Sequence, residues 1–480
     1  MSLILGAQSA TAAGGYEVEN SCWFNGTSQG LVRTNPGTAT TLGTKSTVSF
    51  WAKRTLPNST GTNQFYSYTN GGSSPYNQMY WQSGGGFQWQ NHDTTTNTSL
   101  ITSQLFHDPS AWYHMVFTYD STPATPSSTS IKMFVNGVQV TAFSDETYPA
   151  QNVVSQVCKP SVNFPICYYP STAWYSGHYA EIMVVDGQAL DADQFGEFNS
   201  DSPTIWQPID ISGIDVGNLG CYLEFKDSAS LGTDTSGIGN FTATGLAAIN
   251  QSQDTPTNNW CKMNPLDNYK PVSTFTLADL KIVTSSSAYT FNTGTMGLSA
   301  GKWYFEVLNV VSSDSNKNLI GISGMVSDSG DNYLGEDASG WGYYGADGNV
   351  YNAGSASSYG TAYANGDLVG VYVDLDNNKL YTAENGVINN SGTGISITAA
   401  ASTPNQQYFP AVGDFSSGAP NANFEVNFGN PVAALTSAVA DVNGYGRFEY
   451  SPNDGGSASF DGSAKDFLAI CSKNLGTDGG

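Results

Sequence analysis

Residues 111–120 read AWYHMVFTYD, and residues 131–140 read IKMFVNGVQV. The first stretch alternates two sets of side chains along its length, which is the pattern of a β-strand with two distinct faces. The second stretch contains Asn136-Gly137, a pair that supplies the positive-φ residues of a tight hairpin turn. The segment between them is rich in Pro, Ser and Thr and is not a strand. Together the two stretches predict neighbouring strands of a β-sheet.

His114 lies in the middle of the first stretch, in a chain with only four His residues. A His on a strand is either a catalytic base, a ligand or part of the packing. The same order of strand, Asp, polar turn, strand and Asn-Gly recurs at 368–387 without a His. We therefore predict that His114 is structural.

The composition favours β structure along the whole chain. Of the 480 residues only 12% are charged, 53 are Gly, and 12% are aromatic. Such a mixture favours short strands joined by polar turns over helical bundles. The length also exceeds that of one ordinary domain. We predict an all-β protein with two β-sandwich domains in tandem.

Four linked motifs organise the first part of the chain. They are FWAKR (50–54), WYHMVFTYD (112–120), IKMFVNGVQV (131–140) and GHYAEIMVVDGQALDADQF (177–195). Their order resembles that of laminin-G-like, concanavalin-A-type jelly rolls over residues 21–200. The resemblance implies a two-sheet jelly roll that binds carbohydrate or protein, in some members through calcium. We expect DADQFGEF, near the end of this region, to form a short helical turn.

A second series of strands runs from 271 to 435. Its hallmarks are GKWYFEV (301–307), IGIS (320–323), GWGYYGADGNVYNAG (340–354), GDLVGVYVDLDNNKLYTAENG (366–386) and VNFG (426–429). The series resembles a SPRY domain, another two-sheet β-sandwich. The resemblance implies binding of proteins or peptides through loops at one end, without catalytic machinery.

The remaining segments are an N-terminal arm (1–20), a structured connector (201–270) and a C-terminal segment (436–480), which we expect to pack back on the body. The connector contains DTPTNN (254–259), followed by an aromatic residue and NPL. This string resembles a recurrent segment of marine-phage structural proteins, which often stands beside laminin-G-like domains. The FLAICSKNL stretch near the C-terminus resembles the same proteins.

The charge and the cysteines exclude several classes of function. A net charge of −24 with 16 basic residues argues against nucleic acid as a partner. No run of 18 apolar residues is present, so we expect no membrane insertion, and the N-terminus lacks the pattern of a signal peptide. We expect free, mostly buried thiols, with the pair Cys158 and Cys167 the main candidate for a disulfide bond. The six cysteines are Cys22, Cys158, Cys167, Cys221, Cys261 and Cys471.

The sequence is poor in catalytic patterns. Glycoside hydrolases of jelly-roll type need closely spaced carboxylates on one strand face, and no E-x-D-x-E is present. Glu181 and Asp186 are five residues apart, which predicts opposite faces of a strand, so we interpret Glu181 as structural. A nucleophile elbow and a phosphate-binding loop are also missing. We predict no catalytic residues.

A metal site is not predicted either, although calcium remains a minor alternative. Asp314, Asp328, Asp331, Glu336 and Asp337 share one loop-rich stretch, and calcium prefers such oxygen ligands. The EF-hand pattern is absent, however, and Asp is common in turns for local reasons.

Aromatic clusters beside loops are the candidate binding residues. Exposed rings stack on sugar faces and dominate protein interfaces. The alternative, which the pattern leaves open, is that alternate members fill the core. The candidates are Tyr76, Tyr80, Trp81, Trp89 and His92; Tyr168, Tyr169, Trp174, Tyr175 and His178; and Tyr343, Tyr351 and Tyr359.

These features together favour a non-catalytic virion structural protein of a tailed phage, such as a fibre, an appendage or a capsid decoration. Its expected location is the virion. Its expected partners are a host-surface glycan or protein, neighbouring virion proteins and further copies of itself, since multivalent display turns weak contacts into avidity. The alternatives are a secreted or surface bacterial adhesin and, less favoured, a glycoside hydrolase or lyase.

Overall fold

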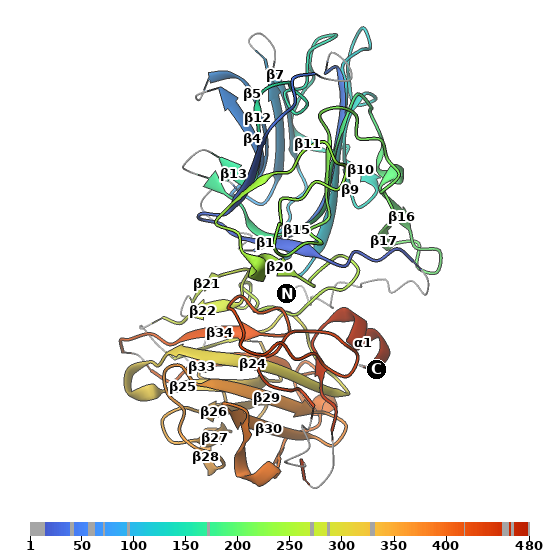
Figure 1. Ribbon diagram of the computed structural model, residues 1–480. Coiled ribbons are helices and arrows are strands. Elements are labelled where there is room, and N and C mark those ends of the chain that lie inside the picture. Colours follow the sequence, from blue (N-terminus) through green and yellow to red (C-terminus); the bar gives the residue numbers. More distant parts are fainter. Residues whose placement is uncertain are drawn as a thin grey trace. The chain divides into compact units, whose positions relative to one another are not determined.

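The computed structural model describes residues 15–38, 43–55, 63–70, 73–93, 97–169, 173–268, 273–285, 289–326, 332–416, 418–453, 460–461 and 465–478. The chain divides into an N-terminal unit that ends at Asn258 and a C-terminal unit that begins at Asn259. Strands dominate both units (Figure 1), and the one α-helix among the described residues is α1 (Ser472–Asp478). The predicted all-β class with tandem sandwiches is confirmed.

Two eight-stranded sheets build the N-terminal unit. Sheet A contains β1 (Ser21–Asn25), β3 (Lys45–Arg54), β8 (Trp112–Asp120), β9 (Ile131–Val135), β10 (Val138–Gln139), β15 (Ser176–Asp186), β18 (Cys221–Leu223) and β20 (Gln251–Ser252). Sheet B contains β2 (Gly30–Thr34), β4 (Asn63–Asn70), β5 (Ser73–Trp81), β6 (Phe87–His92), β7 (Asn97–Thr102), β11 (Phe143–Thr147), β12 (Asn163–Ile166) and β19 (Thr242–Thr244).

Aromatic side chains join the two sheets. Phe50 of sheet A stacks on Phe65 of sheet B with ring centroids 3.9 Å apart, and Phe117 of sheet A meets Phe87 of sheet B at 5.2 Å. All four rings are almost completely buried. Aromatic pairs at such distances add to the free energy gained by burying their area. This core determines which face of each strand points inward.

The turn chemistry agrees with the sequence. Asn136 and Gly137 both have positive φ, 47° and 78°, between β9 and β10, as a type I′ turn requires. The stretch DADQFGEF begins with the 3₁₀ turn η1 (Ala192–Gln194) and continues into β16 (Gly196–Phe198), which pairs with β17 (Trp206–Pro208). The hairpin of β13 (Tyr168–Tyr169) and β14 (Ala173–Trp174) completes the strands of the unit.

Part of the segment separated above as a connector belongs to the sheets of the N-terminal unit. β18 pairs with β15, β19 with β2 and β20 with β1. The loops before β18 cover the face of sheet A that points away from the main core, where Ile211 and Val216 join Met183 and Tyr222 in a second apolar cluster. Sheet A is therefore packed on both faces.

The C-terminal unit has a nine-stranded and a six-stranded sheet. Sheet C contains β21 (Thr274–Thr276), β22 (Lys281–Val283), β24 (Lys302–Val311), β29 (Leu368–Asp374), β30 (Lys379–Glu384), β31 (Val387–Ile388), β32 (Ile395–Ser396), β34 (Asn423–Asn427) and β35 (Leu468–Ala469). Sheet D contains β23 (Thr290–Thr293), β25 (Asn318–Ser323), β26 (Gly340–Tyr344), β27 (Asn349–Asn352), β28 (Ser355–Ser358) and β33 (Phe409–Asp414).

The C-terminal segment packs on one face of sheet C. Phe448 contacts Tyr304, and Phe467 contacts Tyr372, with ring centroids 5.0 Å and 5.1 Å apart. The buried Glu306 carboxylate anchors the same segment, because it accepts hydrogen bonds from the backbone N–H groups of Glu449 and Tyr450 at 3.0 Å and 2.8 Å.

All six cysteines are buried and free. The expectation of free, mostly buried thiols is confirmed, and the one candidate exception, a disulfide bond between Cys158 and Cys167, is not formed. Cys167 lies directly after β12, and Cys158 lies in a loop before it. Both side chains are part of the main core of the N-terminal unit. Burial raises the pKa of both thiols well above the usual value, so neither is a reactive thiolate.

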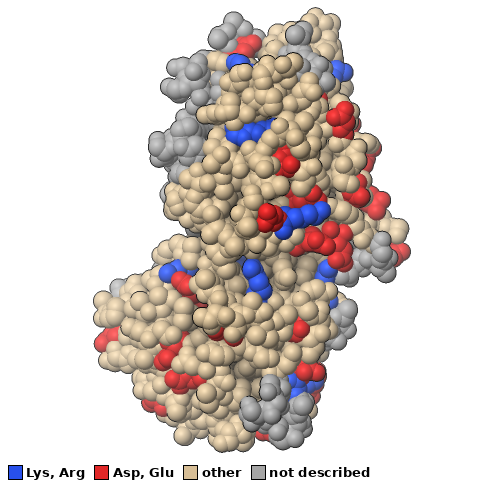
Figure 2. Space-filling model, viewed as in Figure 1, with Lys and Arg blue, Asp and Glu red and all other residues tan. Residues whose placement is uncertain are grey.

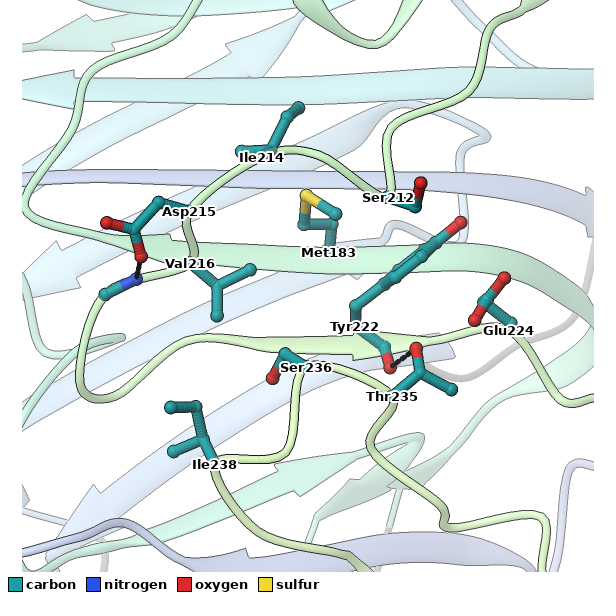
Figure 3. Close-up of a pocket in the computed structure, with 11 residues that line it drawn as sticks. Met183, Ser212, Ile214, Asp215, Val216, Tyr222, Glu224, Thr235, Ser236 and Ile238 are labelled. Carbon is teal, nitrogen blue, oxygen red and sulfur yellow. Dashed lines mark hydrogen bonds between the residues drawn. The ribbon is translucent and has the colours of Figure 1, made fainter.

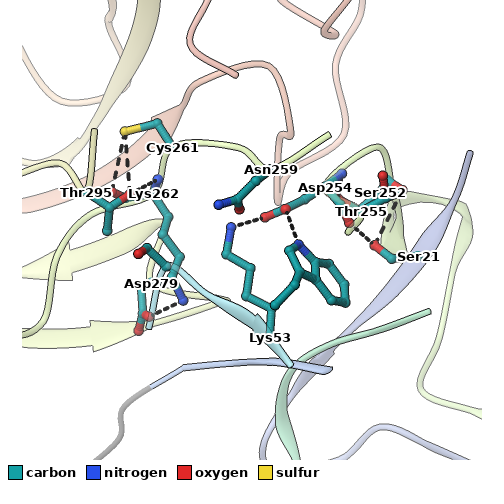
Figure 4. Close-up of polar contacts among 12 residues, drawn as sticks. Ser21, Lys53, Ser252, Asp254, Thr255, Asn259, Cys261, Lys262, Asp279 and Thr295 are labelled. Atoms are coloured by element: carbon teal, nitrogen blue, oxygen red, sulfur yellow. Dashed lines mark hydrogen bonds and ion pairs between the residues drawn. The ribbon is translucent and has the colours of Figure 1, made fainter. Parts of the chain in front are cut away.

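The DTPTNN segment has a structural role in the N-terminal unit. The Lys53 ammonium, completely buried, lies 2.7 Å from the Asp254 carboxylate, and the two side chains face each other in Figure 4. The indole N–H of Trp112 donates to the other Asp254 oxygen at 3.0 Å. In the C-terminal unit, Lys262 and Asp279 form a similar buried pair at 2.8 Å.

We predict that Lys53→Met lowers the free energy of unfolding of the N-terminal unit by about 3–5 kcal/mol, because it leaves the Asp254 charge buried without its cation. Lys45→Met is the matched control, since the Lys45–Asp120 pair at 3.0 Å is partly exposed (40% and 20%) and should contribute less than about 1 kcal/mol. Urea unfolding followed by tryptophan fluorescence measures both. Equal losses in the two variants would contradict this account of the pair.

Candidate functional site

Three cross-strand pairs stand on the face of sheet B that points away from the core. The register of β5 and β6 places Tyr76 opposite His92, Gln78 opposite Gln90, and Tyr80 opposite Gln88. The residues between them, such as Met79 and Trp89, are buried in the core. Because strand side chains alternate between faces, the three pairs must point outward. We call these six residues the polar face.

Local contacts order the polar face. The Tyr76 and His92 rings stack with centroids 4.9 Å apart and planes 10° apart. The Tyr80 hydroxyl donates to the Gln88 side-chain oxygen, which also accepts from the Gln82 amide at 2.8 Å. Except for the more deeply buried Gln88, these side chains are half-buried. The result is a row of rings and amides held in place by its own hydrogen bonds and stacking.

The chemistry of the polar face suits an uncharged, hydroxyl-rich ligand. None of its six residues carries a formal charge apart from His92 when protonated. Ring faces stack against the apolar faces of sugars, and amides both donate and accept hydrogen bonds. A surface of this kind can bind and orient a ligand, and it has no nucleophile beside a base.

Half of the polar face was predicted from the sequence. Tyr76, Tyr80 and His92 were candidates, and the structure brings them together. Gln78, Gln88 and Gln90 were missed, although the two-residue period of PYNQMYW and FQWQNH places each of them in line with a candidate ring. The missed signal is therefore an alternation of aromatic or apolar residues with Gln on two neighbouring strands.

The other candidates in this unit correct the prediction of exposed rings. Trp81 and Trp89 are core residues, and Tyr175 and His178 are also buried. Tyr175 donates from its hydroxyl to the Lys53 carbonyl at 3.1 Å. The reason is again the alternation, which sends every second aromatic residue inward. The side chains of Tyr168, Tyr169 and Trp174 lie outside the described residues.

Most of the candidate binding residues in the C-terminal unit are buried or pack against neighbouring rings. Tyr343 is fully buried and Tyr359 almost so. Tyr351 is half-buried and packs against Tyr344, with ring centroids 5.1 Å apart. Trp341 of the GWGYYG strand is half-buried as well.

His114 and Ser49 lie side by side but are not arranged for catalysis. The His114 Nε2 atom lies 2.9 Å from the Ser49 hydroxyl oxygen. The Trp206 indole donates to His114 Nδ1 at 2.9 Å, so Nδ1 is the acceptor and the proton of the neutral ring resides on Nε2. A ring in this tautomer donates to Ser49 and cannot take its proton. Burial lowers the pKa of His114 to about 3, in agreement with the structural role predicted from the sequence.

Glu181 lies at a β-bulge that the simple alternation of the strand does not predict. The register of β15 against β3 shifts between Ala180 and Met183, and Glu181 has a φ of 49°. Bulges re-aim side chains, and here the buried carboxyl accepts hydrogen bonds from the hydroxyls of Tyr222 and Tyr16, the latter at 3.3 Å. Burial, supported by the nearby Glu224 carboxylate, raises the pKa of Glu181 to about 7.

A cavity of about 320 Å³ opens beside this cluster. Tyr222 and Glu224 lie next to each other at one side of it, and Val216 and Ile238 supply apolar walls (Figure 3). The Glu224 carboxylate pairs with Lys226 at 2.5 Å. Glu181 itself does not line the cavity. It accepts a hydrogen bond from the hydroxyl of Tyr222, which does line it, and so holds that side chain in place.

The calcium candidates do not form a site among the described residues. Asp337 accepts hydrogen bonds from the backbone N–H and hydroxyl of Ser339, and Asp314 pairs with Lys317 at 3.5 Å. Glu336 accepts from the backbone N–H of Tyr333. Asp328 and Asp331 lie outside the described residues. In the described part of the chain, no cluster of three or more His, Cys, Asp or Glu side chains could hold a metal ion.

Charges are sparse over the surface drawn in Figure 2, where basic side chains lie singly among acidic ones. In the described ranges, no helix is sufficiently long and apolar to cross a membrane.

Two family models match the chain, one in each unit. Residues 25–156 match the model of the concanavalin A-like lectin/glucanases superfamily, and residues 302–431 match that of the SPRY domain. The chain therefore contains a laminin-G-like domain of the concanavalin A-like type followed by a SPRY domain. Both kinds of domain are usually binding modules, which supports a ligand-binding role. No curated protein matches the chain.

Solved structures show partial likeness. The SPRY domain of human HERC1 is 15% identical, with 31% of this chain and 87% of that chain covered and a TM-score of 0.26. Another human SPRY domain is 18% identical, with 32% and 92% covered and a TM-score of 0.25. The native heptameric SAP-like pentraxin from Limulus polyphemus is 16% identical, with 38% and 82% covered and a TM-score of 0.27.

We predict that the stability of the N-terminal unit depends on the protonation of Glu181. Its folded pKa of about 7 lies above the ordinary value of 4.5, so the folded state binds the proton more tightly than the unfolded chain does. The stability that the neutral carboxyl contributes is present in full below pH 4.5 and is lost as the pH rises through 7. The loss should approach about 3 kcal/mol.

Glu181→Gln keeps a neutral side chain with an acceptor oxygen, so its stability should not show this fall. The measurement is the difference in unfolding free energy between wild type and variant from pH 4 to pH 8. A difference that stays constant across this range would contradict the predicted protonation of Glu181.

Proposed function

We propose that this chain is a non-catalytic recognition protein whose laminin-G-like domain binds a neutral glycan through the polar face. The observation that carries the proposal is the register of β5 and β6, which aligns Tyr76, Tyr80 and His92 with three Gln side chains. Rings for stacking and amides for hydrogen bonds are the groups that recognise sugars, and an uncharged row suits a ligand without phosphate or sulfate.

The same proposal accounts for the lack of a catalytic arrangement in the described residues. The Ser49–His114 pair has the wrong tautomer for base catalysis. Glu181 is held by two tyrosines on the other sheet, away from the polar face. Binding without turnover is what the geometry supports best.

We further propose that the protein is a structural component of a tailed-phage virion, in which several copies display the polar face toward the host surface. Support comes from the resemblance of the DTPTNN segment to marine-phage structural proteins and from the tandem of a laminin-G-like and a SPRY domain. Weak sugar contacts gain avidity when many copies are displayed together, so a modest surface of six residues is sufficient.

The glycan proposal predicts specific binding of the full chain on an array of neutral polysaccharides, without release of shorter products. Tyr80→Ala should weaken binding by about 10-fold or more and Gln78→Ala by about 10-fold, since each removes a contact worth roughly 1–2 kcal/mol. Gln151→Ala is the control, because Gln151 is exposed and bonds to the Thr122 carbonyl elsewhere on the unit.

Binding that both polar-face variants leave unchanged would contradict the assignment of the surface. Release of products that Glu181→Gln abolishes would favour the alternative of a glycoside hydrolase or lyase.

The virion proposal predicts that peptides of this chain co-purify with capsid and tail proteins through a density gradient of phage particles, as detected by mass spectrometry. Finding the chain only on bacterial cells, and not on particles, would favour the adhesin alternative.

A further inference from the structure

Strand β28 forms an open edge of sheet D in the C-terminal unit. It pairs with β27 on one side, and in the described part of the chain no strand pairs with its other side. Its sequence, SASS, is exposed along its whole length. Natural sheets usually protect edges with charges, Pro or a covering segment, and β28 itself carries no charge and no Pro.

The inward face of this edge is underfilled. Tyr343, Val350 and Ser357 are cross-strand neighbours, and the first two are buried. Ser357 therefore lies on the same face of sheet D as Tyr343 and Val350, but it is exposed where they are buried. Ser355 lies on the same face two residues before. Serine is too small to close the layer.

A cavity of about 480 Å³ occupies the space that these serines leave. Its walls include Trp341 and Val350 from sheet D and Ile395 from sheet C. The cavity therefore lies beside β28, between residues of sheet C and residues of sheet D. Its volume falls in the range of ordinary ligand sites.

A second cavity, of about 560 Å³, adjoins the first, since Tyr359 and Asn390 line both. The Tyr359 hydroxyl is buried at this junction, and a polar neighbour is the backbone of Thr382. Asn390, which lines both cavities, has a φ of 50°, a conformation that Asn adopts more readily than most non-Gly residues.

The charge differs between the two cavities, because the Lys379 ammonium donates to the carbonyl of Gly394, which lines the first one, at 3.4 Å. Glu384 lines the second cavity, and no Lys or Arg is among the described residues that line either. Val387, 71% exposed, stands beside Glu384 as an apolar rim. An occupant should therefore bring an apolar side chain and a basic one. A second copy of this acidic chain is a poor match for that requirement.

We propose that β28 is the docking strand for an extended peptide segment of another protein. The segment pairs with the free edge as a seventh strand of sheet D, which is the β-augmentation mode of peptide binding. It inserts one large apolar side chain into the cavity beside Ser357 and places a Lys or Arg toward Glu384. Main-chain hydrogen bonds supply affinity, and the two cavities supply selectivity.

The test uses the full chain and two pooled libraries of synthetic nonapeptides with apolar residues at alternate positions. One library carries a terminal Lys and the other a terminal Glu. We expect enrichment from the Lys library, and hydrogen exchange of the complex should show new protection at 349–361. Fluorescence anisotropy then gives the affinity of the enriched peptides.

Ser357→Phe should fill the cavity and weaken peptide binding about 10-fold or more, without loss of thermal stability, since it adds apolar contacts. Ala356→Phe is the matched control on the opposite face of the same strand and should change the affinity less than about threefold. Glu384→Gln should reduce the preference for the Lys library about threefold or more.

Three results would overturn the proposal. One is that neither library is enriched. The second is that the enriched peptides bind Ser357→Phe as tightly as wild type. The third is a dimer of the full chain in sedimentation that Ser357→Phe dissociates, which would make a second copy the occupant.

Discussion

The stacking of Phe50 on Phe65, continued by Phe117 on Phe87, holds the two sheets of the N-terminal unit together. Once these rings face each other, the two-residue period determines the direction of the other side chains along each regular stretch of strand. Met79 and Trp81 must point inward with them, and Tyr76, Gln78 and Tyr80 must point outward. The candidate glycan surface thus depends on the core behind it, and a one-residue slip of β5 would bury the surface and expose the core.

The same constraint has a different outcome in the C-terminal unit. There the row of sheet D that contains Tyr343 and Val350 ends in serine at β28, and a cavity lies beside this strand, whose outer edge pairs with no other strand of the described residues. In the N-terminal unit an outward row combines rings with amides, and in the C-terminal unit the corresponding row ends in small residues. Both features are local departures from simple patterning, and such departures are expected at functional sites.

Much of the fold could be predicted from the sequence because its signals are local. The alternation in WYHMVFTYD and the Asn136-Gly137 turn involve neighbouring residues, and both are present in the structure. The burial of Trp81 and Trp89 could not be separated from the exposure of Tyr80 until a register was known. The bulge at Glu181 and the bond from Trp206 to His114, 92 positions apart, depend on tertiary contacts that no short window contains.

The buried polar groups of the N-terminal unit discussed above form hydrogen bonds or ion pairs with partners inside the unit. In the N-terminal unit the buried Lys53 ammonium pairs with Asp254. The His114 ring forms hydrogen bonds with Ser49 and Trp206 of the same unit. Polar groups that are paired in this manner stabilise a unique packing. The proposed glycan binding therefore rests on the half-buried rings and amides of the polar face.

The most direct test of the glycan surface is hydroxyl-radical footprinting of the full chain with and without the sugar that binds it on the array. Mass spectrometry should show that the sugar protects Tyr76, Tyr80 and His92 from oxidation. Trp81 and Trp89, buried on the other side of the same strands, should remain equally protected in both states and serve as an internal reference. Unchanged oxidation of the three polar-face residues, with protection appearing in the SPRY domain instead, would contradict the account.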